Sequence, residues 1–193
     1  MKLKTLLKDV PVREVFNPND SLECTSLTCD SNKVQPGSLF VAIRGANSDG
    51  HSFIREAVSR GALAVLIDSP LSEKPQCPIY AVDNSRDAYA KLAAQFFNHP
   101  SQKVKTIGVT GTNGKTTTTF LLTHILRART KVGMLSTILY DNGRDISEAF
   151  NTTPDPYTVQ ESLRTMCTHG CRYCVMEVSS HALAQNRVTA LHF

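Results

Sequence analysis

The residue types best suited to chemistry occur together in one short run, where glycines precede a lysine and several threonines. Glycines allow backbone N–H groups to approach a phosphate, and a helix that starts just after them points its positive end at the same place. The ammonium of Lys115 is placed to pair with β- and γ-phosphates, and the hydroxyl of Thr116 to hold Mg²⁺. The sequence therefore predicts a nucleotide-phosphate loop formed by Gly111, Thr112, Asn113, Gly114, Lys115, Thr116 and Thr117.

The segments on both sides of this loop have the pattern that a phosphate loop needs. An apolar strand is expected over residues 106–109. A helix is expected after the loop, to about Arg127, with an apolar face made of Phe120, Leu121, Leu122, Ile125 and Leu126. The first glycine of the usual pattern would fall on Val109, and Gly108 and Gly111 lie on either side of it. An ordinary glycine turn is the alternative, and the strand–turn–helix context favours the phosphate loop.

Two later segments carry polar groups where open α/β sheets bind their ligands. Glu177 ends a buried apolar strand, and a carboxylate there can hold Mg²⁺ directly or through water. The run from 151 to 156 reads Asn-Thr-Thr-Pro-Asp-Pro, in which Asp155 is suited to cap a helix and Pro156 to begin it. A capped helix start does not require the three polar residues before the first proline.

Three of the six cysteines have a spacing that resembles an iron–sulfur motif. Cys167, Cys171 and Cys174 match the spacing in the [4Fe–4S] site of radical S-adenosylmethionine enzymes, where the motif follows a barrel strand and opens a helix. Here the motif closes a helical pattern that Gly170 is suited to cap, and residues 174–178 have a buried-strand pattern. We therefore expect Cys174 to be a small core residue. No metal spacing and no disulfides are expected for Cys24, Cys29 and Cys77.

Composition argues against several classes of protein. The chain has 193 residues, of which 41% are hydrophobic and 20% charged, with a formal net charge of +4. Its basic residues are scattered, which argues against nucleic-acid and anionic-membrane binding. No apolar stretch is long enough to cross a membrane, and the N-terminus is too polar for a signal peptide. We expect a cytoplasmic monomer with no nucleic-acid partner and no membrane insertion.

Strand and helix patterns alternate along the chain and predict an α/β fold with parallel sheets and right-handed crossovers. The expected strands cover residues 39–43, 64–67, 79–82, 106–109, 132–140 and 174–178. Further helices are expected at 53–60, 87–97 and 157–168. Because His99-Pro100-Ser101 interrupts the pattern, we expect a small α/β domain over residues 1–99 and a P-loop-type parallel-sheet domain over residues 100–193.

The second domain is expected to be truncated. The chain stops at Phe193, in what is expected to be the next strand of its sheet. A sheet without its later strands exposes an edge. We therefore expect the front part of a longer protein, inactive and poorly soluble by itself.

The motifs taken together resemble the Mur ligases. The run Gly-Thr-Asn-Gly-Lys-Thr after an apolar strand is similar to their ATP loop, which the related folylpolyglutamate synthetases share. Residues 28–32, 34–45 and 49–53 are similar to the opening of the family members that extend UDP-N-acetylmuramoyl peptides. The Asn-Thr-Thr-Pro-Asp run is similar to the member that adds the third peptide residue.

The resemblance implies an ATP- and Mg²⁺-dependent ligase of peptidoglycan biosynthesis. Its reaction would add meso-diaminopimelate or L-lysine to UDP-N-acetylmuramoyl-L-alanyl-D-glutamate through an acyl phosphate. Its small-molecule partners would be ATP, that UDP-muramoyl dipeptide and the diamino acid. The family's C-terminal domain, which selects the amino acid, lies outside this sequence.

The resemblance also assigns roles to individual residues. Lys115 and Glu177 are the implied catalytic residues, and Thr116 and Glu177 the implied metal ligands. The uridine-binding front domain would use Cys29, Ser31, Ala46, Asn47 and Ser48, although Asn32 departs from the arginine common in the family's Asp-Ser-Arg. The muramoyl peptide would contact Asn151, Thr152, Thr153, Ser179, Gln185 and Arg187. His181 is left out of the catalytic set, because a structural histidine that opens a helix is at least as well supported as a catalytic one, and its role stays open.

Two alternatives stay open. A folylpolyglutamate synthetase-like ligase shares the ATP loop but lacks the uridine-binding front domain, so residues 28–53 argue against it. A truncated module that binds nucleotide or UDP-sugar without turnover would carry the same motifs. Activity distinguishes this module from an enzyme.

Overall fold

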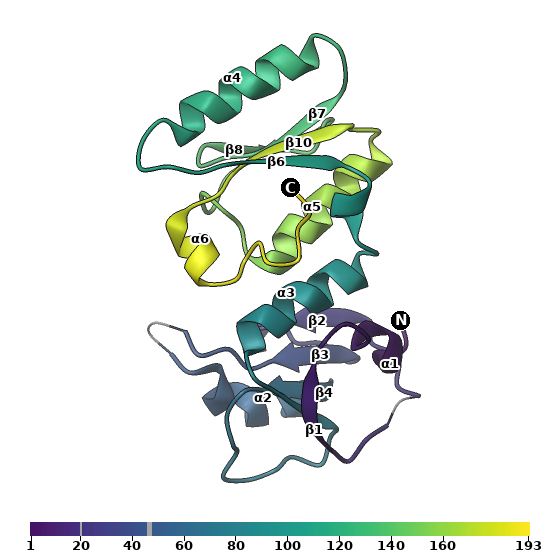
Figure 1. Ribbon diagram of the computed structural model, residues 1–193. Helices are drawn as coiled ribbons and strands as arrows, with labels where there is room; N and C mark the ends of the chain where they lie inside the picture. The colour runs from purple at the N-terminus through teal and green to yellow at the C-terminus, as the bar shows by residue number, and fades with distance from the viewer. Residues whose placement is uncertain (20, 46–47) are drawn as a thin grey trace. The chain divides into compact units, whose positions relative to one another are not determined.

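The computed structural model describes residues 1–19, 21–45 and 48–193. The chain divides into two compact units, Met1–Phe96 and Phe97–Phe193, which we call the front unit and the rear unit. Each unit is built on a five-stranded sheet with helices between its strands (Figure 1). This arrangement confirms the α/β prediction. No helix in the described ranges is long and apolar enough to cross a membrane.

The front sheet has the strand order β1-β5-β4-β3-β2. Its strands β2 to β5 run parallel, and β1 pairs antiparallel with β5, so the sheet is mixed where a parallel sheet was predicted. The sequence pattern located three of the strands and missed β1 and β2. The bounds are β1 (Val12–Phe16), β2 (Ser26–Thr28), β3 (Ser38–Val41), β4 (Ala62–Ile67) and β5 (Ile79–Val82).

Helices and 3₁₀ turns connect these strands. They are α1 (Leu3–Leu6), η1 (Ser31–Lys33), η2 (Gly50–Phe53), α2 (Ile54–Ser59) and α3 (Ser85–Phe96). One core cluster joins Phe40, Val65 and Ile79 of the sheet to Ile54 and Ala57 of α2. Removing such side chains from water is the main favourable contribution to folding.

The rear sheet has the order β6-β10-β7-β8-β9. Its bounds are β6 (Lys105–Val109), β7 (Val132–Leu135), β8 (Leu139–Asp141), β9 (Ile146–Glu148) and β10 (Tyr173–Glu177). The neighbours β6, β10 and β7 are parallel, whereas β8 and β9 form an antiparallel extension. The helical elements of this unit are η3 (Pro100–Gln102), α4 (Lys115–Arg127), α5 (Pro156–Thr168) and α6 (Ser180–Ala184).

The two long crossovers of the rear unit lie on opposite faces of the sheet. Figure 1 shows α4 on one side of the strands and α5 on the other. The chain passes from β6 over β10 to β7 through α4, and then returns to β10 through α5. Parallel strands whose crossovers diverge in this way leave a crevice at their carboxyl ends, where open α/β sheets bind ligands. The loops after β6, β7 and β10 meet at this edge.

The predicted strand over residues 132–140 is wrong as a single element, because the chain reverses at Ser136. The Ser136 hydroxyl donates to the Leu139 carbonyl at 2.9 Å and accepts the N–H groups of Ile138 and Leu139. This local turn separates β7 from the antiparallel β8. A serine side chain that bonds nearby backbone groups competes with strand pairing, which the apolar pattern does not reveal.

Two further expectations need correction. The buried residues of α4 are Thr119 and Thr123, whereas Leu121 and Ile125 are 58% and 65% exposed, so the predicted apolar face is only partly the packed one. The expected strand near the chain end is also wrong, because residues 185–190 form turns and no strand follows. By contrast, the predicted start of α5 is confirmed: Asp155 accepts the N–H groups of residues 157 and 158, and Pro156 is the first helical residue.

Candidate active site

The predicted phosphate loop lies between β6 and α4, with its glycines in conformations that other residues rarely adopt. Gly111 has φ +144° and Gly114 has φ +80°. An L side chain at such a position carries strain of about 1–3 kcal/mol. Lys115 is the first residue of α4, and its Nζ donates to the Gly111 carbonyl at 2.9 Å. The lysine side chain thus folds back over the loop that precedes it.

Glu177, at the end of β10, is fully buried and lies among hydrogen-bond donors from two other segments. Its Oε2 accepts the hydroxyl of Thr116 on α4 at 3.0 Å and that of Thr137 at 3.2 Å. Its Oε1 accepts the backbone N–H of Thr137 at 2.9 Å. A buried carboxylate needs such partners, because burying an unpaired charge is very costly. The structure therefore brings together the two residues predicted to hold a metal.

The donor set at this point suits a small divalent cation. Mg²⁺ prefers oxygen ligands at about 2.0–2.1 Å in octahedral geometry, so that neighbouring ligand oxygens lie about 3 Å apart. The 3.0 Å between Thr116 Oγ1 and Glu177 Oε2 matches this spacing. The pair can occupy two adjacent positions around one cation.

The residues predicted to contact the muramoyl peptide, which we call the acceptor residues, are also brought together near Glu177. The Thr153 hydroxyl donates to the Glu177 carbonyl at 2.9 Å and accepts the Ser179 N–H at 3.0 Å. Arg187 donates to the Thr153 carbonyl at 2.8 Å and through two nitrogens to the Gln185 side-chain oxygen, at 3.1 and 2.7 Å. Residues from α6 and the following turn thereby fix the segment that enters α5.

Tyr140 on β8 holds the beginning of that segment. Its hydroxyl donates to the Asn151 carbonyl at 2.6 Å and accepts the Asn151 N–H at 3.1 Å. Burial raises the pKa of the Tyr140 phenol above its ordinary value, against the opposing effect of the bond to Asn151. The ring therefore stays protonated at neutral pH and serves as a fixed hydrogen-bonding group.

Sequence analysis missed Thr137 and Tyr140. Both follow from the turn at Ser136, which places Thr137 beside Glu177 at the carboxyl end of β10 and leads into β8, which carries Tyr140. A serine and a threonine between two apolar segments give too weak a signal for this turn. His181, left out of the catalytic set, is an exposed residue of α6.

The residues predicted to contact uridine in the front unit are less clearly gathered. Ser31 is buried and its hydroxyl donates to Glu56 at 3.2 Å, while Asn32 accepts hydrogen bonds from Arg60. Ser48 accepts the Gly45 N–H through its carbonyl, and Cys29 is exposed. The predicted residues Ala46 and Asn47 lie outside the described ranges.

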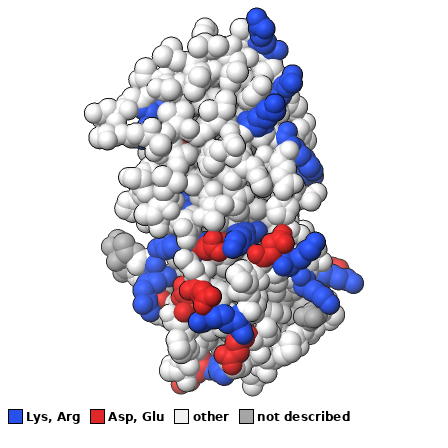
Figure 2. All heavy atoms as spheres, viewed as in Figure 1, with Lys and Arg blue, Asp and Glu red and all other residues white. Residues whose placement is uncertain are grey.

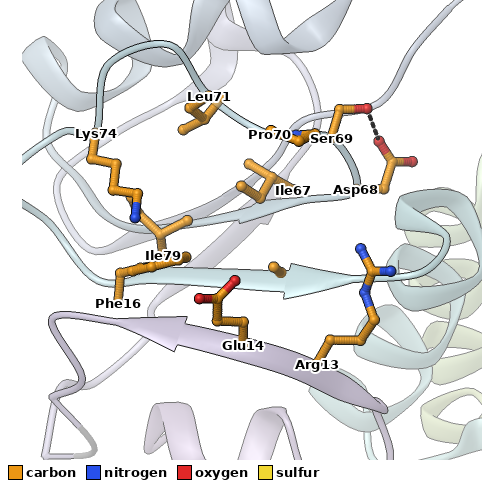
Figure 3. Close-up of a pocket in the computed structure, with 11 residues that line it drawn as sticks. Arg13, Glu14, Phe16, Ile67, Asp68, Ser69, Pro70, Leu71, Lys74 and Ile79 are labelled. Carbon is orange, nitrogen blue, oxygen red and sulfur yellow. Dashed lines mark hydrogen bonds between the residues drawn. The ribbon is translucent and has the colours of Figure 1, made fainter.

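A separate pocket of about 310 Å³ lies in the front unit between β1, β5 and the loop after β4. Figure 3 shows the Lys74 side chain above Phe16, and the Lys74 Nζ lies 3.3 Å from the ring centroid. Asp68 and Ser69 border the opposite end of the pocket. Cys29, Ser31 and Ser48 do not line it, so the uridine prediction receives no support from this cavity.

The iron–sulfur alternative receives no support from the geometry. In the part of the chain that the structure describes, no three His, Cys, Asp or Glu side chains form a group able to hold a metal. Cys174 is fully buried on β10, as predicted. The thiols of Cys167 and Cys171 instead approach the carbonyls of Pro100 and Asn142.

Two models of one protein family match this chain. The model described as the Mur ligase middle domain matches residues 109–193, and the model described as the Mur ligase family, catalytic domain, matches residues 23–97. The phosphate loop, Glu177 and the acceptor residues all fall within the first match.

Curated relatives are similar over the whole chain. A protein of Cytophaga hutchinsonii named UDP-N-acetylmuramoyl-L-alanyl-D-glutamate–2,6-diaminopimelate ligase is 40% identical over 196 residues, which covers 100% of this chain and 40% of the relative. A protein of the same name from Caldanaerobacter subterraneus is 41% identical over 194 residues, with the same coverage. The chain thus spans about two fifths of the length of these relatives.

Solved structures share the fold. One structure titled UDP-N-acetylmuramoyl-L-alanyl-D-glutamate–2,6-diaminopimelate ligase matches with a TM-score of 0.77 and 22% identity, covering 98% of this chain and 38% of that one. The MurF ligase of Thermotoga maritima in complex with ADP matches with a TM-score of 0.57 and 26% identity, covering 90% and 36%.

Proposed function

The chain belongs to the Mur ligase family, and from this premise we propose that it carries the ATP site and part of the acceptor site of a third-residue ligase. The reaction joins 2,6-diaminopimelate to UDP-N-acetylmuramoyl-L-alanyl-D-glutamate with consumption of ATP. The names of relatives about 40% identical over the whole chain support this substrate pair.

The observation that carries the proposal is the contact between Thr116 and Glu177. Thr116 is the second residue of the helix after the phosphate loop, and Glu177 ends β10, 61 positions later. Their oxygens have the spacing of two neighbouring Mg²⁺ ligands. Thr116 and Glu177 would hold a divalent cation there, and its charge would offset the repulsion between an anionic acceptor and the phosphates of ATP.

The remaining residues of the loop bind and orient phosphate. Lys115 exchanges the Gly111 carbonyl for β- and γ-phosphate oxygens and brings its charge to the group being transferred. The amides of residues 111–117 face the same phosphates at the N-terminus of α4. A carboxylate is a poor electrophile, and its conversion to an acyl phosphate allows the amine to displace phosphate.

The acceptor lies against Thr152, Thr153 and Ser179 in this proposal. Arg187 and Gln185 hold the Thr153 segment through the bonds described above, so that its hydroxyls keep a fixed direction. Asn151 is held in turn by Tyr140. Fixed polar groups of this kind orient the acceptor carboxylate toward the phosphate, and orientation is worth about 7–11 kcal/mol of a barrier in favourable cases.

The front unit carries a uridine-binding site of its own in this proposal, which uses Cys29, Ser31, Ala46, Asn47 and Ser48. Support for this part comes from the family match to residues 23–97. Ser31 is held by Glu56, and its hydroxyl oxygen retains a lone pair that can accept from the ligand.

A direct product assay tests the function. The full-length gene product is incubated with ATP, Mg²⁺ and the UDP-muramoyl dipeptide, and with either diaminopimelate or L-lysine. We expect mass spectrometry to detect the UDP-muramoyl tripeptide with diaminopimelate, and ADP and phosphate to appear in equal amount.

Two results of this assay contradict the proposal. Nucleotide binding without any amide product would identify a binding module. Product formed only in a parallel incubation, with a folate and glutamate in place of the muramoyl dipeptide and diamino acid, would identify a folylpolyglutamate synthetase-like ligase. Exclusive use of L-lysine would change only the identity of the amino acid.

A further inference from the structure

Thr137 lies between the two halves of the proposed active site, although neither the phosphate loop nor the acceptor segment contains it. It is the second residue of the turn after β7, and the bonds of the Ser136 hydroxyl fix its backbone. The turn brings Thr137 next to the end of β10. Its contacts show what it does there.

Thr137 contacts both oxygens of the buried Glu177 carboxylate. Its backbone N–H donates to Oε1 at 2.9 Å and its hydroxyl to Oε2 at 3.2 Å. A carboxylate held at both oxygens by one residue cannot rotate about its last bond. The remaining donor to Oε2 is the Thr116 hydroxyl. Thr137 therefore determines the direction in which Glu177 presents its oxygens to Thr116.

The Thr137 hydroxyl also contacts Thr152 Oγ1, at 3.1 Å. A hydroxyl has one proton to donate and lone pairs to accept, and an ionised carboxylate only accepts. The proton of Thr137 is thus directed to Glu177, and Thr152 is the donor in the second contact. The hydroxyls form one ordered chain from the acceptor segment to the carboxylate.

We propose that Thr137 is a positioning residue that orients Glu177 for a divalent cation and connects this cation site to Thr152 in the acceptor site. The inference rests on the function proposed above, because that function places the cation at Thr116 and Glu177. Partners that orient a metal ligand typically change metal affinity or activity by about 10–100-fold when they are removed. The hydroxyl, rather than the bulk of the threonine, is the group that matters.

The test compares Thr137→Val, which keeps the shape and the backbone N–H, with Thr137→Ser, which keeps the hydroxyl. Mn²⁺ is titrated into each full-length protein without nucleotide, and free Mn²⁺ is measured by electron paramagnetic resonance. We expect Thr137→Val to weaken Mn²⁺ binding about 10–100-fold and Thr137→Ser to remain close to wild type. Thr137→Ala, which also lacks the hydroxyl, replaces the valine variant if that protein does not fold.

Thr123→Val is the matched control. Thr123 is a buried threonine of α4 whose hydroxyl has no hydrogen-bond partner within the described ranges. Replacing it by an isosteric apolar residue is expected to leave Mn²⁺ affinity unchanged. A loss of affinity equal to that of Thr137→Val would show a general effect of threonine replacement in this unit and would overturn the inference.

Glu177→Gln separates the inference from the proposed function. If this variant binds Mn²⁺ as wild type does, the cation site is misplaced and both proposals fail. If it loses Mn²⁺ binding while Thr137→Val does not, only the positioning role fails. With the UDP-muramoyl dipeptide as varied substrate, we also expect Thr137→Val to raise KM through Thr152 as well as to lower kcat, while Thr137→Ser restores both.

Discussion

Each unit places a carboxylate at the end of a parallel strand, but the two carboxylates have different partners. In the front unit Asp68 follows β4, and its Oδ2 accepts the N–H of Ser85 at 3.1 Å and the Ser85 hydroxyl at 2.7 Å. Ser85 is the first residue of α3, so Asp68 binds the first N–H of that helix, while Asn84 accepts the next two. In the rear unit Glu177 instead accepts two threonine hydroxyls and the N–H of a turn.

The difference indicates what each carboxylate is for. The bonds to Asp68 satisfy the first residue of α3 and complete the N-terminus that Asn84 caps, which is a structural task. The donors to Glu177 are two threonine hydroxyls and the N–H of a turn, not the N–H groups of a helix end, and the two hydroxyls carry lone pairs that can face a cation. The two carboxylates therefore have the same position in the fold, and the type of their hydrogen-bond donors distinguishes a structural role from a role in the active site.

Charge is distributed differently as well. Residues 1–96 contain eleven Lys and Arg and eleven Asp and Glu, whereas residues 97–193 contain ten and six, so the whole excess positive charge belongs to the rear unit. Figure 2 shows mixed signs on the front unit and only basic side chains on the drawn face of the rear unit. Surface pairs such as Arg13–Asp83 and Lys91–Asp87 account for part of the balance in the front unit. An excess of basic charge in the rear unit favours an anionic ligand such as a nucleotide.

The largest expected effect is that of Lys115→Ala in the full-length gene product. A lysine that neutralises the transferred phosphate supplies transition-state charge, and removing one such donor typically costs about 10²–10³ in kcat. We expect tripeptide formation, measured by mass spectrometry, to fall at least that far while the circular dichroism spectrum stays unchanged. Lys131→Ala is the control, because Lys131 binds the His169 carbonyl outside the site. Activity within a few-fold of wild type for Lys115→Ala would reject the loop assignment.

Arg187→Lys tests the acceptor half of the rear network and should have a smaller effect. Lysine keeps the charge but cannot donate both to the Thr153 carbonyl and twice to Gln185 as arginine does. Hydrogen bonds from charged groups are worth about 1.5–3 kcal/mol, so we expect the KM for the UDP-muramoyl dipeptide to rise about tenfold or more. Steady-state kinetics at saturating ATP measures this, with the exposed Arg172→Lys as control. A change in the KM for ATP alone would contradict the assignment.

The sequence predicted the central strands and the residue types of the rear site because both depend on local patterns. The apolar runs of β6 and β10 and the Asp155–Pro156 helix start are each readable within a few residues, and the structure confirms them. Glu177 was identifiable because a lone carboxylate ending a buried strand is unusual. Its partner Thr116 was identified from the loop motif 61 positions away.

What the sequence did not predict depends on contacts between distant segments. Strand β1 has exposed side chains along its middle and acquires its place only by pairing with β5. The role of Thr137 depends on a turn set by the Ser136 side chain, which has no signature in periodicity. The buried residues of α4 are Thr119 and Thr123, so hydrophobicity alone identified the packed face of this helix only in part.

Ser31→Ala tests the front unit. We expect this variant to bind the UDP-sugar more weakly without a slower chemical step. Removing a hydroxyl that accepts one hydrogen bond costs about 0.5–1.5 kcal/mol, equivalent to about a 2–10-fold weaker UDP-sugar complex. Nuclear magnetic resonance titration of residues 1–99 with a UDP-sugar measures this, and Ser59→Ala is the control because Ser59 only binds the Glu56 carbonyl. Shifts confined to the pocket of Figure 3 would relocate the uridine site.

The smallest expected effect is that of Asp68→Ala, which tests the structural side of the comparison. Burial raises the pKa of Asp68, but the bonds from Ser85 and the neighbouring His51, whose Nε2 lies 3.3 Å away, outweigh this, so the pKa lies below its ordinary value. A lowered pKa means that the carboxylate stabilises the fold above its unfolded-state pKa, and that this contribution disappears as pH falls through the folded-state pKa. We therefore expect Asp68→Ala to cost about 1–2 kcal/mol at pH 7, as for the loss of a side-chain bond to a helix N-terminus, and less at a pH low enough to protonate the wild-type carboxylate. Asp49, whose pKa lies at about 2 because of its bonds to His51 and Arg44, faces the other side of the same imidazole and contributes in the same direction.

Urea unfolding followed by circular dichroism at both pH values gives the difference in the free energy of unfolding, and comparison with Asp49→Asn separates the two carboxylates. If the difference in the free energy of unfolding between wild type and Asp68→Ala stays constant with pH, the bonds to α3 do not depend on the charge of Asp68. If Asp68→Ala loses tripeptide formation, this carboxylate does more than hold α3.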